Sequence, residues 1–201
     1  DTDSQTTELS LKAMISFRNA RLSFDGLPQG LSAEASKTNG FVSFQQYPKL
    51  QVYAKGYLNE PAQSSFYADG LINIETTDIS GRVEISDAKA EDLVQIGLIP
   101  EEYRQITGLV SASAAGSYSG GTFTVNDARL VIKNGSFAHD ILPMDLEDIT
   151  INASYDGQYI KVQKGAARAG ATQLELLGTV NMADFQNPSF EDLTLKASDV
   201  T

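Results

Sequence analysis

The sequence predicts an all-β protein whose strands pair mainly in an antiparallel way. Apolar and polar residues alternate along most of the chain, and a period of two residues is typical of a strand with one buried face. Asx-Gly and Gly-Gly pairs, which favour tight hairpin turns, separate many of these runs. Residues 90–106 carry helix signals instead. We therefore expect a sheet of hairpin-connected strands with one or two short helices around residues 90–106.

The first strand group is expected over residues 8–89, behind a polar and acidic tail of residues 1–7 that we expect to be disordered. Its alternating apolar pairs are Leu9 and Leu11, Leu22 and Phe24, Ile72 and Ile74, and Val83 and Ile85. Each pair encloses one polar residue. Each run therefore presents one apolar face and one polar face.

A helical insertion is expected over residues 90–107. Pro100 suits the first position of a helix, and Glu101 and Glu102 complement the positive end of the helix dipole. Gly108 stands where a helix stop is expected. A second strand group then fills residues 108–201, and we expect it to form one continuous domain with the first.

Hairpin turns are expected at six pairs of turn-forming residues. They are Asp25-Gly26, Asn39-Gly40, Asp69-Gly70, Gly120-Gly121, Asn134-Gly135 and Asp156-Gly157. The last has the clearest signal, because Asp and Gly both tolerate the positive φ angles of a two-residue hairpin turn.

Composition limits the possible partners. The chain has 201 residues, and its 15 basic and 26 acidic side chains give a formal net charge of -11. This charge repels phosphate backbones and anionic lipid surfaces, so we expect no nucleic-acid partner. The chain has no cysteine, which excludes disulfides and a cysteine nucleophile and leaves the compartment open. No apolar run is long enough for a membrane-spanning helix.

Nothing in the sequence indicates a catalytic site, and we expect neither enzyme activity nor a cofactor or metal. His139 with Asp140 suggests a catalytic triad, but no nucleophile elbow accompanies the pair, so a solvated loop histidine is favoured. Acidic residues cluster at three places and suggest a glycosidase or a calcium site. They are Glu101 and Glu102, then Asp145, Glu147 and Asp148, and then Glu191 and Asp192. A solvated acidic surface is the simpler interpretation.

The apolar strand faces outnumber the amphipathic helices that would cover them. One solution is a closed sandwich or barrel, in which two apolar faces cover each other. The other is a curved or folded sheet whose apolar concave side stays partly open as a groove for an apolar ligand. The periodicity alone does not separate the two.

A sequence pattern recurs in segments of residues 69–200. In it, a Leu-Pro-x-x-Leu element such as Leu142 to Leu146 precedes a strand, a hairpin and a strand that opens Gly-x-Val, such as Gly178 to Val180. The segments are residues 69–74, 81–88, 92–100, 106–113, 128–135, 142–153, 176–182 and 193–200. With this sequence pattern, the chain resembles the AsmA-like and TamB-like superfamily of bacterial envelope proteins.

The resemblance implies a folded-over, β-taco-like sheet that encloses a hydrophobic groove. It also implies a periplasmic location, with the membrane anchor of the parent protein outside this chain. Phospholipid or another acyl-chain ligand and other envelope proteins would be the partners, and lipid transport or outer-membrane assembly the function. A scaffold with a closed β core and no lipid ligand is the alternative, and a glycan hydrolase is a third hypothesis.

The groove hypothesis predicts that apolar residues of the second strand group share one face and contact acyl chains. The candidates are Phe123, Val125, Ile149, Ile151, Ile160, Val162, Leu174, Leu176, Val180, Met182, Leu193 and Leu195. An acyl chain needs such a surface, because each CH₂ group removed from water contributes about 0.8 kcal/mol. Ordinary core packing is the alternative for each of them.

Overall fold

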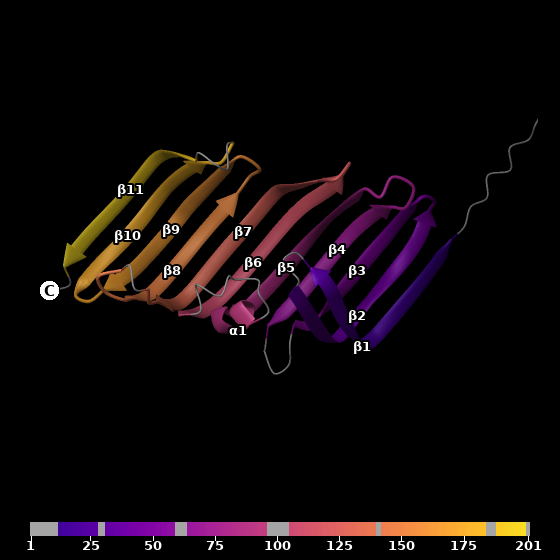
Figure 1. Cartoon of the computed structure of the whole chain (residues 1–201), viewed down its shortest axis with the longest axis horizontal. Helices are drawn as coiled ribbons and strands as arrows, with labels where there is room; N and C mark the ends of the chain where they lie inside the picture. The colour runs from indigo at the N-terminus through magenta and orange to yellow at the C-terminus, as the bar shows by residue number, and fades with distance from the viewer. Residues whose placement is uncertain are drawn as a thin grey trace, which may run out of the picture.

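The chain forms one antiparallel sheet of 11 strands that follow one another in sequence order (Figure 1). This computed structural model describes residues 12–27, 31–58, 64–95, 105–139, 142–183 and 188–199. The all-β, antiparallel prediction is therefore confirmed. The expected tail of residues 1–7 lies outside the described residues.

Each strand pairs with the strand before it in the chain. The first group comprises β1 (Ala13–Leu27), β2 (Leu31–Gln46), β3 (Lys49–Leu58), β4 (Ser65–Asn73) and β5 (Ile79–Lys89). The second comprises β6 (Ile106–Ser119), β7 (Thr122–Phe137), β8 (Leu146–Tyr155), β9 (Tyr159–Ala169), β10 (Thr172–Asn181) and β11 (Ser189–Asp199). Because β5 pairs directly with β6, the two groups belong to the same sheet.

Helix α1 (Ala90–Gln95) follows β5 and carries Glu91 and Asp92 in its first turn, where negative charges suit the helix dipole. Its Leu93 is buried against Val110 and Ile132 of the sheet. The expected second helical piece falls on residues 96–104, outside the described residues. Ile106, which was expected in the helical region, instead opens β6.

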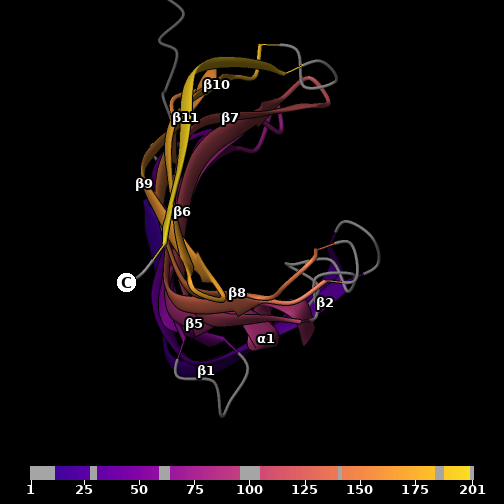
Figure 2. The same ribbon diagram turned by 90° about the vertical axis from the view of Figure 1, so that its left-hand side faces the viewer.

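The sheet is curved and open. Figure 2 shows the strands bent into a C when the molecule is viewed along its long axis. In Figure 1, β1 and β11 lie at opposite ends of that axis, and they do not pair with each other. The closed sandwich or barrel considered from the sequence is therefore wrong, because no second layer and no β1–β11 contact closes the described sheet.

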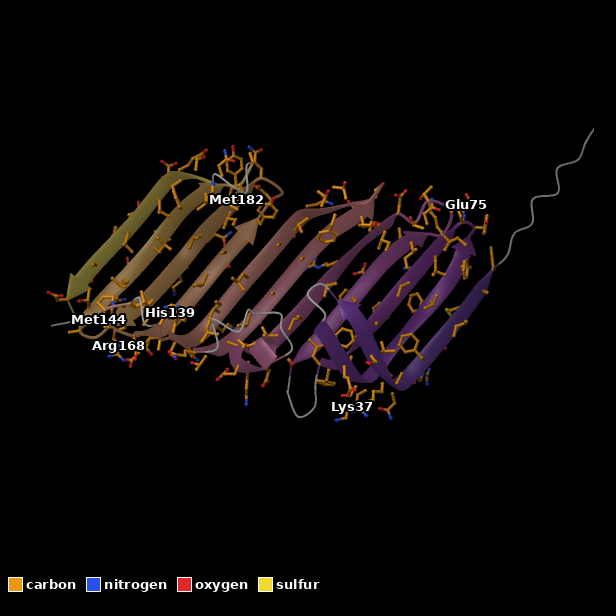
Figure 3. All side chains as sticks on the ribbon, in the orientation of Figure 1. Lys37, Glu75, His139, Met144, Arg168 and Met182 are labelled. Atoms are coloured by element: carbon orange, nitrogen blue, oxygen red, sulfur yellow. The ribbon has the colours of Figure 1, made fainter. Side chains whose placement is uncertain are left out.

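Residues with positive φ angles interrupt the strand pairing along the sheet. They are Asn19, Lys37, Asp87, Gly108, Asn134, Asp148, Gly178 and Asp192. Each lies at a register shift between neighbouring strands. Such bulges bend a strand and increase its twist. In the view of Figure 3, the Lys37 bulge lies at the lower margin of the sheet, whereas Glu75 and Met182 lie at the upper margin.

Polar side chains from adjacent strands hold several of these bulges. The Asn39 side-chain oxygen accepts a hydrogen bond from the Asn19 backbone N–H at 3.1 Å, across β1 and β2. The Ser111 hydroxyl accepts one from the Asp87 N–H at 3.0 Å, across β5 and β6. These bonds satisfy donors that the shifted register leaves outside the regular ladder.

Two of the six expected turns are confirmed. Gly120-Gly121 connects β6 to β7, and Asp156-Gly157 lies between β8 and β9. The other four pairs lie inside strands, and the turn predictions there are wrong. Asn134-Gly135 shows the physical reason, because the positive φ of Asn134 serves a bulge within β7 rather than a turn.

The β8–β9 hairpin is organised by Asp156. Its carboxylate accepts hydrogen bonds from the Tyr159 N–H at 2.8 Å and from the Gln158 N–H at 3.2 Å. The Lys161 Nζ donates to the same carboxylate at 2.7 Å. The Lys161 hydrogen bond, followed by the backbone bonds, lowers the pKa of Asp156 from 3.8 to about 2.

We expect Asp156→Asn to lower the melting temperature by a few degrees at pH 7. Because the folded-state pKa lies below the unfolded value, the stabilisation is present above pH 3.8 and is lost as the pH falls through about 2. The effect stays small because the group is exposed to solvent. Thermal melts of both proteins between pH 7 and pH 2 should therefore converge at the acid end, and a constant difference would contradict the account.

Candidate functional site

Strand pairing assigns the side chains to two faces of the sheet. Residues directly opposite each other on adjacent strands share a face. Val83 on β5 pairs with Ala68 on β4 and with Ala114 on β6, and all three line a hollow in the sheet. We call the face that contains these residues the concave face, and the hollow that runs along it the trough.

One row of paired residues on the concave face crosses all 11 strands without a charged side chain. It runs Phe17, Gly40, Ala54, Ala68, Val83, Ala114, Ala128, Tyr155, Ile160, Val180 and Phe190. With neighbouring strands about 4.8 Å apart, this row is about 48 Å long. The trough therefore has an apolar floor along its whole described length.

A second row on the same face is equally apolar and crosses β5 to β11. It runs Ala88, Val110, Ile132, Ile151, Gly165, Leu176 and Leu195. Its exposure changes along the sheet: Ile132 is 9% exposed beneath α1, whereas Leu195 on β11 is 67% exposed. The trough is thus packed near α1 and uncovered at the β11 end of the described sheet.

Two cavities occupy the central part of the trough. The first has a volume of about 340 Å³, and its apolar side chains include Ile72, Ile79 and Phe123. The second has a volume of about 410 Å³, and its walls include Leu130 and Ile160. Both are lined by Val83 and Ala114, so the two cavities adjoin at this pair.

Small residues deepen the trough in the first cavity. Gly70, Gly81 and Gly116 are opposite one another on β4, β5 and β6. A Cβ atom on Gly81 would lie 2.5 Å from the carbonyl oxygen of Asp69, so a side chain cannot be accommodated there without a shift of the backbone. The floor at this point consists of backbone alone, while Ile72 and Ile79 form the wall beside it.

The opposite, convex face carries charged and aromatic groups. Arg168 on β9 donates to Asp148 at 3.0 Å and also pairs with Glu147 on β8. The rings of Phe41 and Tyr53 stack with centroids 5.4 Å apart across β2 and β3. These contacts stabilise the sheet from outside. Because the convex face is charged and the concave face is apolar, the concave face is the candidate binding surface for an apolar ligand.

The strand register groups eleven of the twelve predicted groove residues on the concave face. They are Phe123, Val125, Ile149, Ile151, Ile160, Val162, Leu174, Leu176, Val180, Leu193 and Leu195. Met182 differs, because it follows the end of β10 and lies at the upper margin (Figure 3). Its backbone N–H donates to the Gln158 carbonyl at 2.8 Å.

Sequence reasoning missed the amino-terminal half of the trough as a binding surface. Val52, Ile72, Ile79 and Tyr118 line the first cavity but were not among the candidates. The available signal was the run Ala112, Ala114 and Gly116, in which every second residue is small and apolar. A run of small apolar residues forms the floor of a trough, just as a run of larger apolar residues forms its wall.

The titratable groups considered for catalysis are dispersed. The ring centroid of His139 lies 5.8 Å from that of Phe137, and His139 is at the lower margin of the sheet (Figure 3). Asp140 is outside the described residues. The carboxylates of Glu147 and Asp148 are engaged by Arg168. No group of three or more His, Asp or Glu side chains within the described ranges is arranged to hold a metal ion.

Comparison with known proteins adds no assignment: no family model, no curated protein and no solved structure matches the chain. In the part of the chain that the structure describes, no helix is both long and apolar enough to cross a membrane.

Proposed function

We propose that this chain is a non-enzymatic module that offers its trough to the acyl chains of phospholipids. The observation that carries the proposal is the uncharged row from Phe17 to Phe190, which crosses every strand of an open sheet. An uncovered apolar surface of this extent is costly in water unless something occupies it. Val83, in the middle of the row, remains 51% exposed.

An acyl chain suits this surface better than a peptide does. The floor consists of apolar side chains and of backbone whose hydrogen-bonding groups are already used in the sheet. An extended peptide on that floor would leave its own N–H and C=O groups without partners, at considerable cost. A hydrocarbon chain has no such groups and gains about 0.8 kcal/mol for each CH₂ that it removes from water.

The resemblance to the AsmA-like and TamB-like superfamily suggests the compartment in which the chain would bind acyl chains. On this proposal the sheet is a β-taco-like section of a periplasmic protein, anchored in the membrane by a segment outside this chain. Phospholipid transport or outer-membrane assembly would then be the process that it serves. The curvature in Figure 2 and the apolar concave face are the features that favour it.

A scaffold function is the second candidate, and the exposure of β11 favours it. Every residue of β11 is exposed, and its outer edge has no strand partner among the described residues. An exposed strand edge is the kind of surface through which a scaffold pairs with a strand of an envelope protein. A scaffold would need no lipid. The form of this hypothesis with a closed β core is excluded, because the described sheet is open.

The test is binding of a phospholipid with a fluorescent acyl chain to the purified protein. We expect saturable binding that unlabelled phospholipid displaces, because the trough recognises hydrocarbon. The water-soluble glycerophosphoethanolamine headgroup should not displace the probe. Displacement by the headgroup alone, or no saturable binding, would refute the proposal and leave the scaffold function as the better account.

A further inference from the structure

Each of the two cavities in the trough has one side chain with a polar atom on the concave face. In the first cavity, the strand register assigns this position to Tyr118 on β6. In the second cavity it is Tyr155 on β8. The other polar residues that border the cavities, such as Ser117 and Arg129, alternate with these positions and belong to the convex face. Among the described residues, a ligand in the cavities therefore meets two hydroxyl groups and otherwise apolar side chains.

The two tyrosine hydroxyls differ in their hydrogen bonds. The Tyr155 hydroxyl donates to the carbonyl oxygen of Gly157 at 2.7 Å, within its own hairpin. The Tyr118 hydroxyl has no hydrogen-bond partner among the described residues, and the side chain is 40% exposed. Tyr118 is therefore the residue whose hydroxyl is available to a ligand.

Tyr118 lies where the apolar trough meets solvent. It is opposite Ile79 on β5 and Phe123 on β7. Ile79 begins β5 four residues after Glu75, which lies at the upper margin of the sheet in Figure 3. A tyrosine suits such a boundary, because its ring is apolar and its hydroxyl is polar. The polar end of a lipid would also remain at this boundary, in contact with water.

The length of an acyl chain matches the path from Tyr118 into the second cavity. Along β6, Ala114 is four residues from Tyr118, about 13 Å, and it stands where the two cavities adjoin. The hydrocarbon core of a bilayer is about 30 Å thick, so one acyl chain spans about 15 Å. A chain whose polar end is at Tyr118 therefore passes Ala114 and ends in the second cavity.

We propose that Tyr118 positions the polar end of a bound lipid, and that its hydroxyl donates a hydrogen bond to an ester or phosphate oxygen. The acyl chain then runs along β6 past Ala114 into the second cavity. This inference rests on the proposed function, because it places a lipid in the trough. One hydrogen bond contributes little by itself, so the acyl chain still provides most of the affinity. Tyr118 would determine how the lipid is oriented and would favour lipids over plain hydrocarbon.

Tyr118→Phe tests the hydrogen bond, because it removes the hydroxyl and keeps the ring. Three ligands compete with the fluorescent phospholipid: dodecyl phosphate carries a phosphate, methyl dodecanoate carries an ester, and dodecane carries neither. We expect the variant to lose affinity about threefold or more for the phosphate, the ester or both. Its affinity for dodecane should not change. The ligand that is weakened identifies the oxygen that accepts the hydrogen bond.

Tyr159→Phe is the matched control. Tyr159 begins β9 beside the β8–β9 turn, and it lies on the convex face because it alternates with Ile160. Its loss of a hydroxyl should leave all three affinities unchanged. Unchanged affinity of Tyr118→Phe for both oxygen-bearing ligands, or an equal loss for dodecane, would overturn the inference and leave acyl-chain binding intact. If the unmodified chain bound none of the three ligands, the proposed function would be refuted, and the inference with it.

Fluorescence quenching tests the orientation of the lipid, since the chain contains no tryptophan of its own. Phe123→Trp places a fluorophore opposite Tyr118, and Leu130→Trp places one in the second cavity. Phospholipids brominated near the ester should quench the tryptophan at position 123 more strongly than the one at position 130. Phospholipids brominated near the methyl end should show the reverse order. Equal quenching at the two positions, or the opposite order, would overturn the inference.

Discussion

Replacing Val83 with Asp should reduce phospholipid binding at least tenfold while the protein stays folded. Val83 lines both cavities, and its side chain is half exposed, so the fold can accommodate a hydrated carboxylate. That carboxylate retains water where the acyl chain would lie. Loss of contact with about two CH₂ groups costs about 1.6 kcal/mol, and about 1.4 kcal/mol corresponds to a tenfold change in affinity. Titration with the fluorescent phospholipid measures the change.

Thr124→Asp is the matched control for this prediction. Thr124 on β7 lies between Phe123 and Val125 but on the convex face, where it is exposed and lines neither of the two cavities. It receives the same charge without placing it in the trough. Equal losses of binding in the two variants would mean that charge, rather than the apolar floor, determines the affinity.

Replacing Ile132 with Ala should give a larger loss of stability than truncation of a trough-lining residue on the same strand. Ile132 is 9% exposed and packs with Val110 and with Leu93 of α1. Truncation leaves a cavity beneath the helix, and such changes cost about 2–4 kcal/mol. Urea denaturation followed by circular dichroism measures the free energy of unfolding.

Leu130→Ala is the comparison for the stability prediction. Leu130 lies two residues before Ile132 on the same face of β7 but is 36% exposed and borders the second cavity. Its truncation should cost less than half as much as that of Ile132, because less buried surface is lost. If Leu130→Ala destabilised the protein as much as Ile132→Ala, the trough wall would be a packed core rather than an open surface.

The alternation of apolar and polar residues was sufficient to predict the all-β fold class and most of the apolar residues that share the concave face. Ile149 and Ile151, or Leu174 and Leu176, alternate regularly and share the concave face. A buried face must repeat at the period of the backbone pleat, so this information is local in the sequence. The all-β sheet follows from it directly.

Bulges could not be predicted in the same way. Asn134-Gly135 has the composition of a hairpin turn, because a turn and a bulge both use residues that tolerate positive φ. A bulge also changes which residues share a face: Val125 and Ala128 lie on the same side of β7 although they are three apart. Only the pairing with the neighbouring strand reveals such a shift.

The open shape depends on long-range geometry that no short segment encodes. Alternating strands are equally compatible with a closed barrel and with an open, curved sheet. In the structure, bulges held by contacts such as the Asn19–Asn39 hydrogen bond accompany the curvature of the sheet. The Gly81 and Gly116 floor was missed because a search for large apolar residues ignores small ones.

The most direct test of the acyl-chain trough compares two neighbouring leucines on β10. Leu176 lies on the concave face opposite Leu195, whereas Leu177 lies on the convex face opposite Thr194. A photoreactive amino acid placed at each position, in protein equilibrated with phospholipid vesicles, reports contact with lipid. We predict lipid adducts at position 176 and at most background adducts at position 177. Equal adduct yields at the two positions, or none at position 176, would contradict the account.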